Sequence, residues 1–281
     1  MYKTFKTGIP LLDKYLGGGI PRGTVALYGE DNSGATSLSL SIAREAALMG
    51  ATTAFIALKG GTSPQYIRRH CGASCAFSSP RFGAEAFEQS AALLIGGVSV
   101  LILDSLDAAV PLADTVDMIG EREPLGQNRL LLLGMRTLRD LAMQTGALVV
   151  TTSEMRTQLP TRKLVPTYRT VLGDCANTRI LLKKSGFISE YGTVLYRRGK
   201  ARIEQSMLTP PGGEVEFKLW DTRGIDRGSE LLGALIATGV LVGGKSHIMD
   251  NGKSIGHGFN KARDTVSNNY QEYYSRLMEM K

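Results

Sequence analysis

The chain has 281 residues, a formal net charge of +7 and a hydrophobic content of 43%. This length suits one large domain with a small second one, and no apolar run approaches the roughly 20 residues that cross a bilayer. The first residues lack the apolar stretch of a signal peptide, and the three cysteines form no disulfide framework, so we expect a protein of the reducing cytoplasm.

Short apolar strands alternate with helical stretches in the first half of the chain, which predicts a mostly parallel sheet with helices on both faces. The strands are expected at 24–27, 51–58, 98–104 and 147–152, and the helices at 36–49, 84–94 and 127–144. Shorter strands at 178–184, 192–196, 201–204 and 215–220 predict an antiparallel extension. A helix at 228–238, a hairpin turn at Asn251-Gly252 and a helix at 258–280 follow. We therefore place a core at 1–225 and a small α/β C-terminal domain at 226–281.

A phosphate-binding loop follows the first strand, but it lacks its usual cation. The functional pattern is G-x-x-x-x-G-K-[ST], in which backbone N–H groups cradle the phosphates and the lysine reaches the β and γ phosphates. Gly29, Gly34 and Thr36 stand at the required spacing, whereas Ala35 occupies the lysine position. The sequence therefore indicates descent from a nucleoside triphosphatase (NTPase) with a weakened or absent activity.

Two features bear on metal binding. Asp104 ends the apolar strand at 98–104, where such NTPases place the aspartate that orients Mg²⁺ through water while the loop threonine binds the metal. We interpret Asp104 as this inherited aspartate, and a carboxylate that caps the next turn is the alternative. His70, Cys71 and Cys75 also lie close in sequence, but no second ligand pair with zinc-like spacing follows. We interpret these three residues as structural and assign no metal site.

Positive charge concentrates between Arg156 and Lys184, where Asp174 is the only acidic residue. Part of this run, 157–169, is interpreted as a loop that carries several cations and two prolines. A solvated basic face is one explanation of such a run, and contact with a nucleic acid is the other.

Several segments resemble the bacterial RecA recombinase family in order and in letters. The matching segments are 7–13 (TGIPLLD), 16–23 (LGGGIPRG), the loop after Tyr28, 53–56 (TAFI), 64–66 (PQY), 103–105 (LDS) and 108–111 (AAVP). Near the other end, 224–226 (GID) and 251–258 (NGKSIGHG) resemble the entry into the RecA C-terminal domain. The resemblance covers nearly the whole chain. It implies an α/β fold, with a RecA-like phosphate-loop NTPase core and a small C-terminal domain.

The departures from the RecA pattern fall on catalytic positions. At the position of the general-base glutamate this chain has Lys59, and a cation cannot accept a proton from water at neutral pH. At the position of the glutamine that senses the γ phosphate it has Glu154, whose carboxylate repels a triphosphate. Two lysines that act on the neighbouring protomer's nucleotide align with Gln205 and Met207. Because phosphoryl transfer depends on positioning and electrostatics, we expect no meaningful hydrolysis and assign no catalytic residue.

Nucleotide binding is a separate question, because the loop still offers N–H groups at a helix N-terminus. Tyr66 matches the tyrosine that RecA stacks on adenine, although Ser63 replaces the adjoining aspartate. No cofactor is required under this interpretation; weak binding of ATP or ADP with Mg²⁺ and an empty loop kept for the fold are both left open. The residues assigned to this vestigial nucleotide site are Gly29, Ser33, Gly34, Ala35, Thr36, Tyr66 and Asp104.

The resemblance also implies two DNA-binding loops, at 120–129 and at 158–173, and a basic C-terminal domain. Arginine and lysine suit phosphates, and Tyr168 is expected to stack on a base for ~1–3 kcal/mol. Arg136 and Arg139, on the same expected helix as Arg129, are equally explained as a solvated stripe. The residues assigned to DNA binding are Arg122, Arg129, Arg156, Arg162, Lys163, Tyr168, Arg169, Lys245 and Lys253.

We expect DNA, single- or double-stranded, as the partner, with a recombinase or replication protein as a further candidate and no membrane. Only residues 1–5 precede the matched core, so the N-terminal segment through which RecA proteins dock onto the next protomer has no counterpart, and self-assembly is left open.

Three functions compete. The first is a DNA-binding pseudo-ATPase, an accessory in recombination, repair or replication. The second is a protein-interaction regulator of a recombinase or polymerase, and the third is an ATPase that uses an unorthodox cation such as Lys59.

Overall fold

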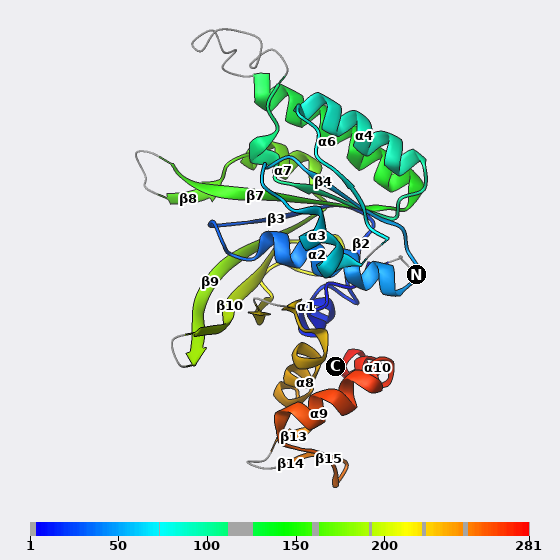
Figure 1. The fold of residues 1–281 in the computed structure, drawn as a ribbon, viewed down its shortest axis with the longest axis vertical. Coiled ribbons are helices and arrows are strands. Elements are labelled where there is room, and N and C mark those ends of the chain that lie inside the picture. The colour runs from blue at the N-terminus through cyan, green and yellow to red at the C-terminus, as the bar shows by residue number, and fades with distance from the viewer. Residues whose placement is uncertain are drawn as a thin grey trace.

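The computed structural model describes residues 4–72, 74–111, 126–158, 163–190, 193–220, 223–243 and 247–280. A large sheet forms its centre (Figure 1). The strands of this sheet are β3 (Gly23–Gly29), β4 (Thr53–Ala57), β5 (Ala76–Ser78), β6 (Val100–Asp104), β7 (Leu148–Gln158), β9 (Thr178–Glu190), β10 (Thr193–Gln205), β11 (Glu214–Trp220) and β12 (Gly224–Ile225), and β8 (Lys163–Pro166) pairs with β7.

The sheet has a parallel half and an antiparallel half. Its strand order is β12-β11-β10-β9-β3-β7-β6-β4-β5. The strands from β9 through β5 run parallel to their neighbours, whereas β10, β11 and β12 pair antiparallel. The predicted parallel core and its antiparallel extension are both confirmed.

Helices cover both faces of the parallel half, because its strands are apolar on both sides. Along β3, Val25 and Leu27 join the hydrophobic core on the α2 side, and Ala26 and Tyr28 join the core on the α6 side. The first core includes residues of α1 (Pro10–Tyr15), α2 (Ala35–Leu48) and α3 (Pro64–Cys71); the second includes residues of α4 (Gly83–Ile95), α6 (Gly126–Thr145), α7 (Arg169–Cys175) and the 3-10 turn η1 (Leu106–Ala108). None of the helices in the described ranges combines the length and the apolarity needed to cross a bilayer.

The last part of the chain packs around a third core, separate from the first two. Its elements are α8 (Arg227–Ala237), β13 (Val242–Gly243), β14 (His247–Asp250), β15 (Lys253–His257), α9 (Gly258–Asn268) and α10 (Tyr270–Glu279). The expected hairpin turn joins β14 to β15, with φ of 47° at Asn251 and 80° at Gly252. A folding boundary at 225/226 agrees with this arrangement and stays a prediction.

Buried polar contacts attach this C-terminal part to the core. The Arg227 Nη1 atom lies 3.3 and 3.2 Å from the two carboxylate oxygens of Glu45 on α2. The carboxylate of Asp13 on α1 accepts hydrogen bonds from the Thr7 N–H at 2.8 Å and from the Tyr274 hydroxyl at 3.2 Å. A small two-stranded sheet, β1 (Thr4–Phe5) with β2 (Ile20–Pro21), lies near the beginning of the chain.

Three elements differ from the prediction. The segment 157–169 is no simple loop, because β7 continues to Gln158 and pairs with β8. The single helix expected at 258–280 is two helices, which separate at Asn269, where φ is −111° and ψ is 35°. The two short strands expected at 192–196 and 201–204 form one long strand, β10, whose irregularities are register shifts against β9.

Candidate nucleotide pocket and DNA-facing surface

A cavity of about 730 Å³ opens beside the phosphate-binding loop, where the parallel strands β3, β6 and β7 end or approach their carboxyl ends. Open α/β sheets bind their ligands in this position. All seven residues assigned to the vestigial nucleotide site line the cavity, although they come from three separate segments of the chain: Gly29, Ser33, Gly34, Ala35, Thr36, Tyr66 and Asp104.

The two glycines of the loop are required by close packing. A Cβ atom on Gly29 would lie 2.3 Å from the carbonyl oxygen of Leu182 and 2.5 Å from the Ser33 hydroxyl. Gly34 has a φ of +99°, a left-handed conformation that side chains disfavour, directly before α2 begins. The backbone shape of the loop is therefore kept, while Ala35 contributes no charge to it.

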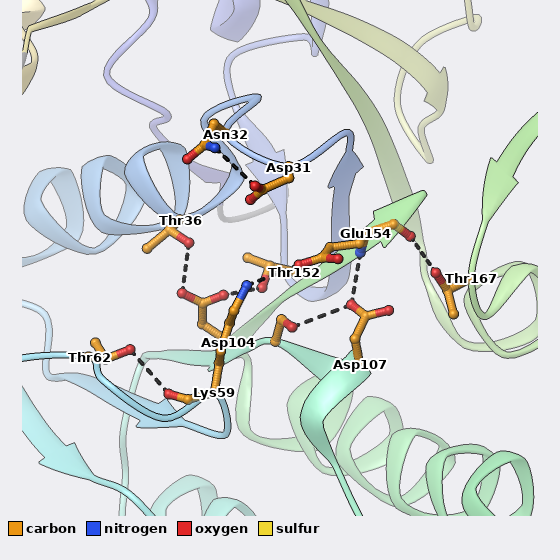
Figure 2. Close-up of polar contacts among 11 residues, drawn as sticks. Asp31, Asn32, Thr36, Lys59, Thr62, Asp104, Asp107, Thr152, Glu154 and Thr167 are labelled. Atoms are coloured by element: carbon orange, nitrogen blue, oxygen red, sulfur yellow. Dashed lines mark hydrogen bonds and ion pairs between the residues drawn. The ribbon is translucent and has the colours of Figure 1, made fainter. Parts of the chain in front are cut away.

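Asp104, at the end of β6, is held by two threonines. Its carboxylate accepts a hydrogen bond from the Thr36 hydroxyl at 2.8 Å and another from the Thr152 hydroxyl on β7 (Figure 2). The neighbouring Ser105 hydroxyl donates to Asp107 at 3.3 Å. The geometry brings together the residue types that hold Mg²⁺ in phosphate-loop NTPases, and here they bond to one another.

The two residues that depart most from the RecA pattern contact each other. The Lys59 Nζ atom lies 3.1 Å from Glu154 Oε1, across the cavity from the end of β4 to β7 (Figure 2). The hydrogen bond and the charge of Glu154 raise the pKa of Lys59 above its usual 10.5. Both side chains are largely exposed, at 58% and 45%, so the pair is solvent-screened.

The backbone of Glu154 is fixed by residues that the sequence did not single out. Asp107 accepts a hydrogen bond from the Glu154 N–H at 2.8 Å, and the Thr167 hydroxyl donates to the Glu154 carbonyl at 2.8 Å. Burial raises the pKa of Asp107. The sequence offered one signal for this contact. Asp107 follows Asp104 by only one 3-10 turn, so its carboxylate lies near the same end of the sheet.

Two further residues reach the cavity from the antiparallel half of the sheet. Arg197 on β10 and Trp220 at the end of β11 both line it. The Trp220 ring packs against Tyr196, with centroids 4.8 Å apart, and the Arg223 guanidinium lies 4.2 Å from the ring centroid. Their sequence positions gave no signal, because only the strand order brings them to the loop.

The residues assigned to DNA binding are dispersed. Arg129, Arg156 and Arg169 are exposed, on α6, on β7 and at the start of α7. Lys253 is exposed on β15, at the bottom of the view in Figure 1 and well below the strands β7 and β8. Arg122, Arg162, Lys245 and the side chain of Lys163 lie outside the described residues.

Tyr168 requires a correction. Its ring is only 8% exposed and belongs to the core on the α6 side, and burial raises its pKa to about 12. A ring in this position does not stack on a base, so the expectation that Tyr168 does so is wrong for this conformation. Arg136 and Arg139 fit the solvated explanation, since Arg136 lies 3.9 Å from Asp174 and Arg139 lies 3.0 Å from Asp140.

His70, Cys71 and Cys75 pack as structural residues. His70 Nδ1 is hydrogen-bonded to the Tyr66 carbonyl at 2.9 Å, and the three cysteines of the chain are buried and free. Within the described ranges, no group of three or more histidine, cysteine or acidic side chains is placed to hold a metal ion.

A mostly parallel sheet, a glycine loop between its central strand and a helix, and an aspartate at the end of β6 define a phosphate-loop NTPase fold. The sequence model of the RecA N-terminal domain matches residues 2–226. The chain therefore belongs to the RecA family.

Curated relatives agree with this assignment. Protein RecA of Haemophilus ducreyi is 32% identical over 265 residues, which cover 91% of this chain and 71% of that protein. Protein RecA of Desulforapulum autotrophicum is 30% identical over 285 residues, covering 97% of this chain and 82% of the relative. Protein RecA of Blastochloris viridis is 29% identical over 265 residues, covering 91% and 76%. The fold is that of a recombinase-like, DNA-binding ATPase.

Proposed function

We propose that this chain is a DNA-binding pseudo-ATPase that acts as an accessory in DNA recombination, repair or replication. The observation that carries the proposal is the ion pair of Lys59 and Glu154, at the two positions where the RecA pattern places the general base and the γ-phosphate sensor. The pair replaces a proton acceptor by a cation and a neutral amide by an anion. The family fold is retained, whereas these two positions of the hydrolytic site differ from the pattern.

The chemistry of the pocket supports the absence of hydrolysis. Attack of water on a phosphoryl group needs a group that positions the water and cations that offset the developing charge. Lys59 is a cation at neutral pH, and its hydrogen bond to Glu154 raises its pKa further above the usual 10.5. Ala35 adds no cation, and the described lining contains the carboxylates of Glu30, Asp31, Asp104 and Glu154. The backbone cradle fits an anion, but these side chains do not fit a magnesium triphosphate poised for hydrolysis.

The DNA-binding part rests on charge and placement. The chain carries a net charge of +7, and Arg156 and Arg169 are exposed on elements that flank residues 159–162. Exposed arginines bind phosphates in a sequence-independent way. Asp174 offsets Arg136, but no ion pair with a described acid involves Arg156 or Arg169.

The test is binding to labelled single- and double-stranded DNA across a salt series, with and without ATP. The double variant Arg156→Ala/Arg169→Ala is compared with Arg136→Ala/Arg139→Ala, which removes the same charge from arginines that already face acids. We expect ATP-independent binding, with log K falling by about 0.9 per phosphate contact with log salt on duplex DNA. The salt slope of the first variant should correspond to one or two fewer phosphate contacts. The salt slope of the second variant should change little.

A second candidate, the protein-interaction regulator, has one observation in its favour. An apolar groove of about 420 Å³ lies beside the edge strand β5 and is lined in part by Phe77, Leu93 and Val98. Edge strands with an adjoining apolar groove accept an extended peptide as an additional strand. No DNA binding at low salt would overturn the first proposal and favour this one, whereas binding that requires ATP would favour the unorthodox ATPase.

A further inference from the structure

The cavity is lined by two exposed cations, and one of them is paired with an exposed carboxylate of the same cavity. Of its described lining residues only Lys59 and Arg197 are positive, against the four carboxylates named above. Lys59 projects from the segment after β4 and is 58% exposed, and its partner Glu154 is 45% exposed. Exposed pairs of this kind contribute at most about 1 kcal/mol, so a phosphate group can displace the carboxylate.

The same cavity holds polar groups without partners. The hydroxyl of Ser153, a residue only 5% exposed, and the indole N–H of Trp220 are buried and have no hydrogen-bond partner among the described residues. Both residues line the cavity. Buried donors without acceptors are costly, so an acceptor atom placed against either group would be stabilised there.

We propose that Lys59 is the phosphate-binding cation of this pocket, and that Glu154 is a built-in competitor that a nucleoside diphosphate displaces. Lys59 thus takes over, from the opposite wall, the charge that Ala35 does not supply. A diphosphate suits the site better than a triphosphate, because each added negative charge faces Asp104 and Glu154. The inference concerns the nucleotide pocket and is independent of DNA binding.

Trp220 gives a direct readout of this pocket, since it lines the cavity and is the single tryptophan of the chain. The full chain is titrated with ADP and with ATP, both with Mg²⁺, and Trp220 emission is followed alongside calorimetry. The variants are Lys59→Gln, Glu154→Gln and the double variant. Matched controls are Lys261→Gln and Glu88→Gln, exposed residues outside the cavity lining.

We expect ADP to bind at least as tightly as ATP. Glu154→Gln should tighten ADP binding about fivefold, the equivalent of the ~1 kcal/mol of an exposed pair, and Lys59→Gln should weaken it about tenfold or more. The double variant should bind no better than Lys59→Gln, because the position of Glu154 then has no Lys59 ammonium to compete for. The controls should match the wild type.

Two results would overturn the proposal. An equal gain from Glu154→Gln with and without Lys59 would mean that Glu154 acts by simple repulsion. No heat and no change in Trp220 emission in any variant would mean that the pocket binds no diphosphate. DNA titrations on the same variants, without nucleotide, distinguish either failure from a failure of the proposed DNA-binding function.

Discussion

The contact between Arg227 and Glu45 allows a sharp prediction about what holds the C-terminal part to the core. The Glu45 side chain is 3% exposed and receives Arg227 Nη1 at 3.3 and 3.2 Å, while the Arg227 guanidinium also lies 3.8 Å from the Tyr270 ring centroid. The substitution Arg227→Met keeps much of the aliphatic stem and removes the charge. It leaves a carboxylate buried without its cation.

The expected cost follows from that burial. Removing one partner of a buried ion pair costs ~3–5 kcal/mol, because the remaining charge is desolvated and unpaired. Arg44 lies near Glu45 and offsets part of this, so we expect about 3 kcal/mol, at the lower end of that range. In the double variant Glu45→Gln/Arg227→Met no charge is stranded. We therefore expect a total loss of about 1 kcal/mol, much of it the lost contact with the Tyr270 ring.

The assay is urea unfolding at pH 7, followed by circular dichroism and by Trp220 fluorescence. The two single variants, the double variant and the wild type form a cycle with an expected coupling of about 2 kcal/mol. The exposed pair of Lys59 and Glu154 gives a matched cycle, whose coupling should stay below about 1 kcal/mol. An Arg227→Met loss under ~1 kcal/mol, or equal coupling in both cycles, would refute the reasoning from burial. Separate transitions for the two probes would support the boundary at 225/226.

Three further predictions concern single residues. Ala35→Lys should tighten ATP binding about tenfold in a calorimetric titration without producing phosphate release, since Lys59 still occupies the base position; measurable turnover would contradict this. Burial raises the pKa of Asp13 from 3.8 to about 7, so its unfolded form ionises first and stability falls as pH rises from about 4 to about 7. Asp13→Asn should flatten that part of the stability–pH curve, by up to about 4 kcal/mol, and an unchanged curve would count against the shift. Gly29→Ala should lower the free energy of unfolding by ~2 kcal/mol or more, because its Cβ would lie 2.3 Å from the Leu182 carbonyl oxygen, and a neutral melting temperature would be the contrary result.

Much of the core could be predicted because its signals are local. Continuous apolar runs marked β3, β6 and β7, and the long amphipathic stretch of α6 appears within one residue of its expected start. The spacing of Gly29 and Gly34 located the loop. The end of the apolar strand at 98–104 placed Asp104 beside it, and the family resemblance placed Tyr66 there. All four of these residues line one cavity.

The remaining features depend on contacts that a sequence does not display. The two prolines in 157–169 indicated a loop, yet Pro166 ends β8 opposite Met155, because an edge strand tolerates a residue without an N–H. The sequence predicted that Tyr168 is available for stacking, but in the structure its ring packs in the core with residues of α7. Lys59 and Glu154 are 95 residues apart, and β6 separates their strands, so only the folded sheet shows that the two departures compensate each other in charge.

Asp104 has a structural role that does not depend on metal binding. Its carboxylate ties α2 to β7 through Thr36 and Thr152, so replacing it by an apolar residue would leave the buried Thr152 hydroxyl without its acceptor. An aspartate anchored in this way resists mutational drift whether or not a metal ever binds. Sequence searches for ATPase homologues that lack activity should therefore give little weight to this aspartate. Ala35 and Lys59, which stand where the phosphate-loop and RecA patterns place the lysine and the general base, bear more directly on hydrolysis.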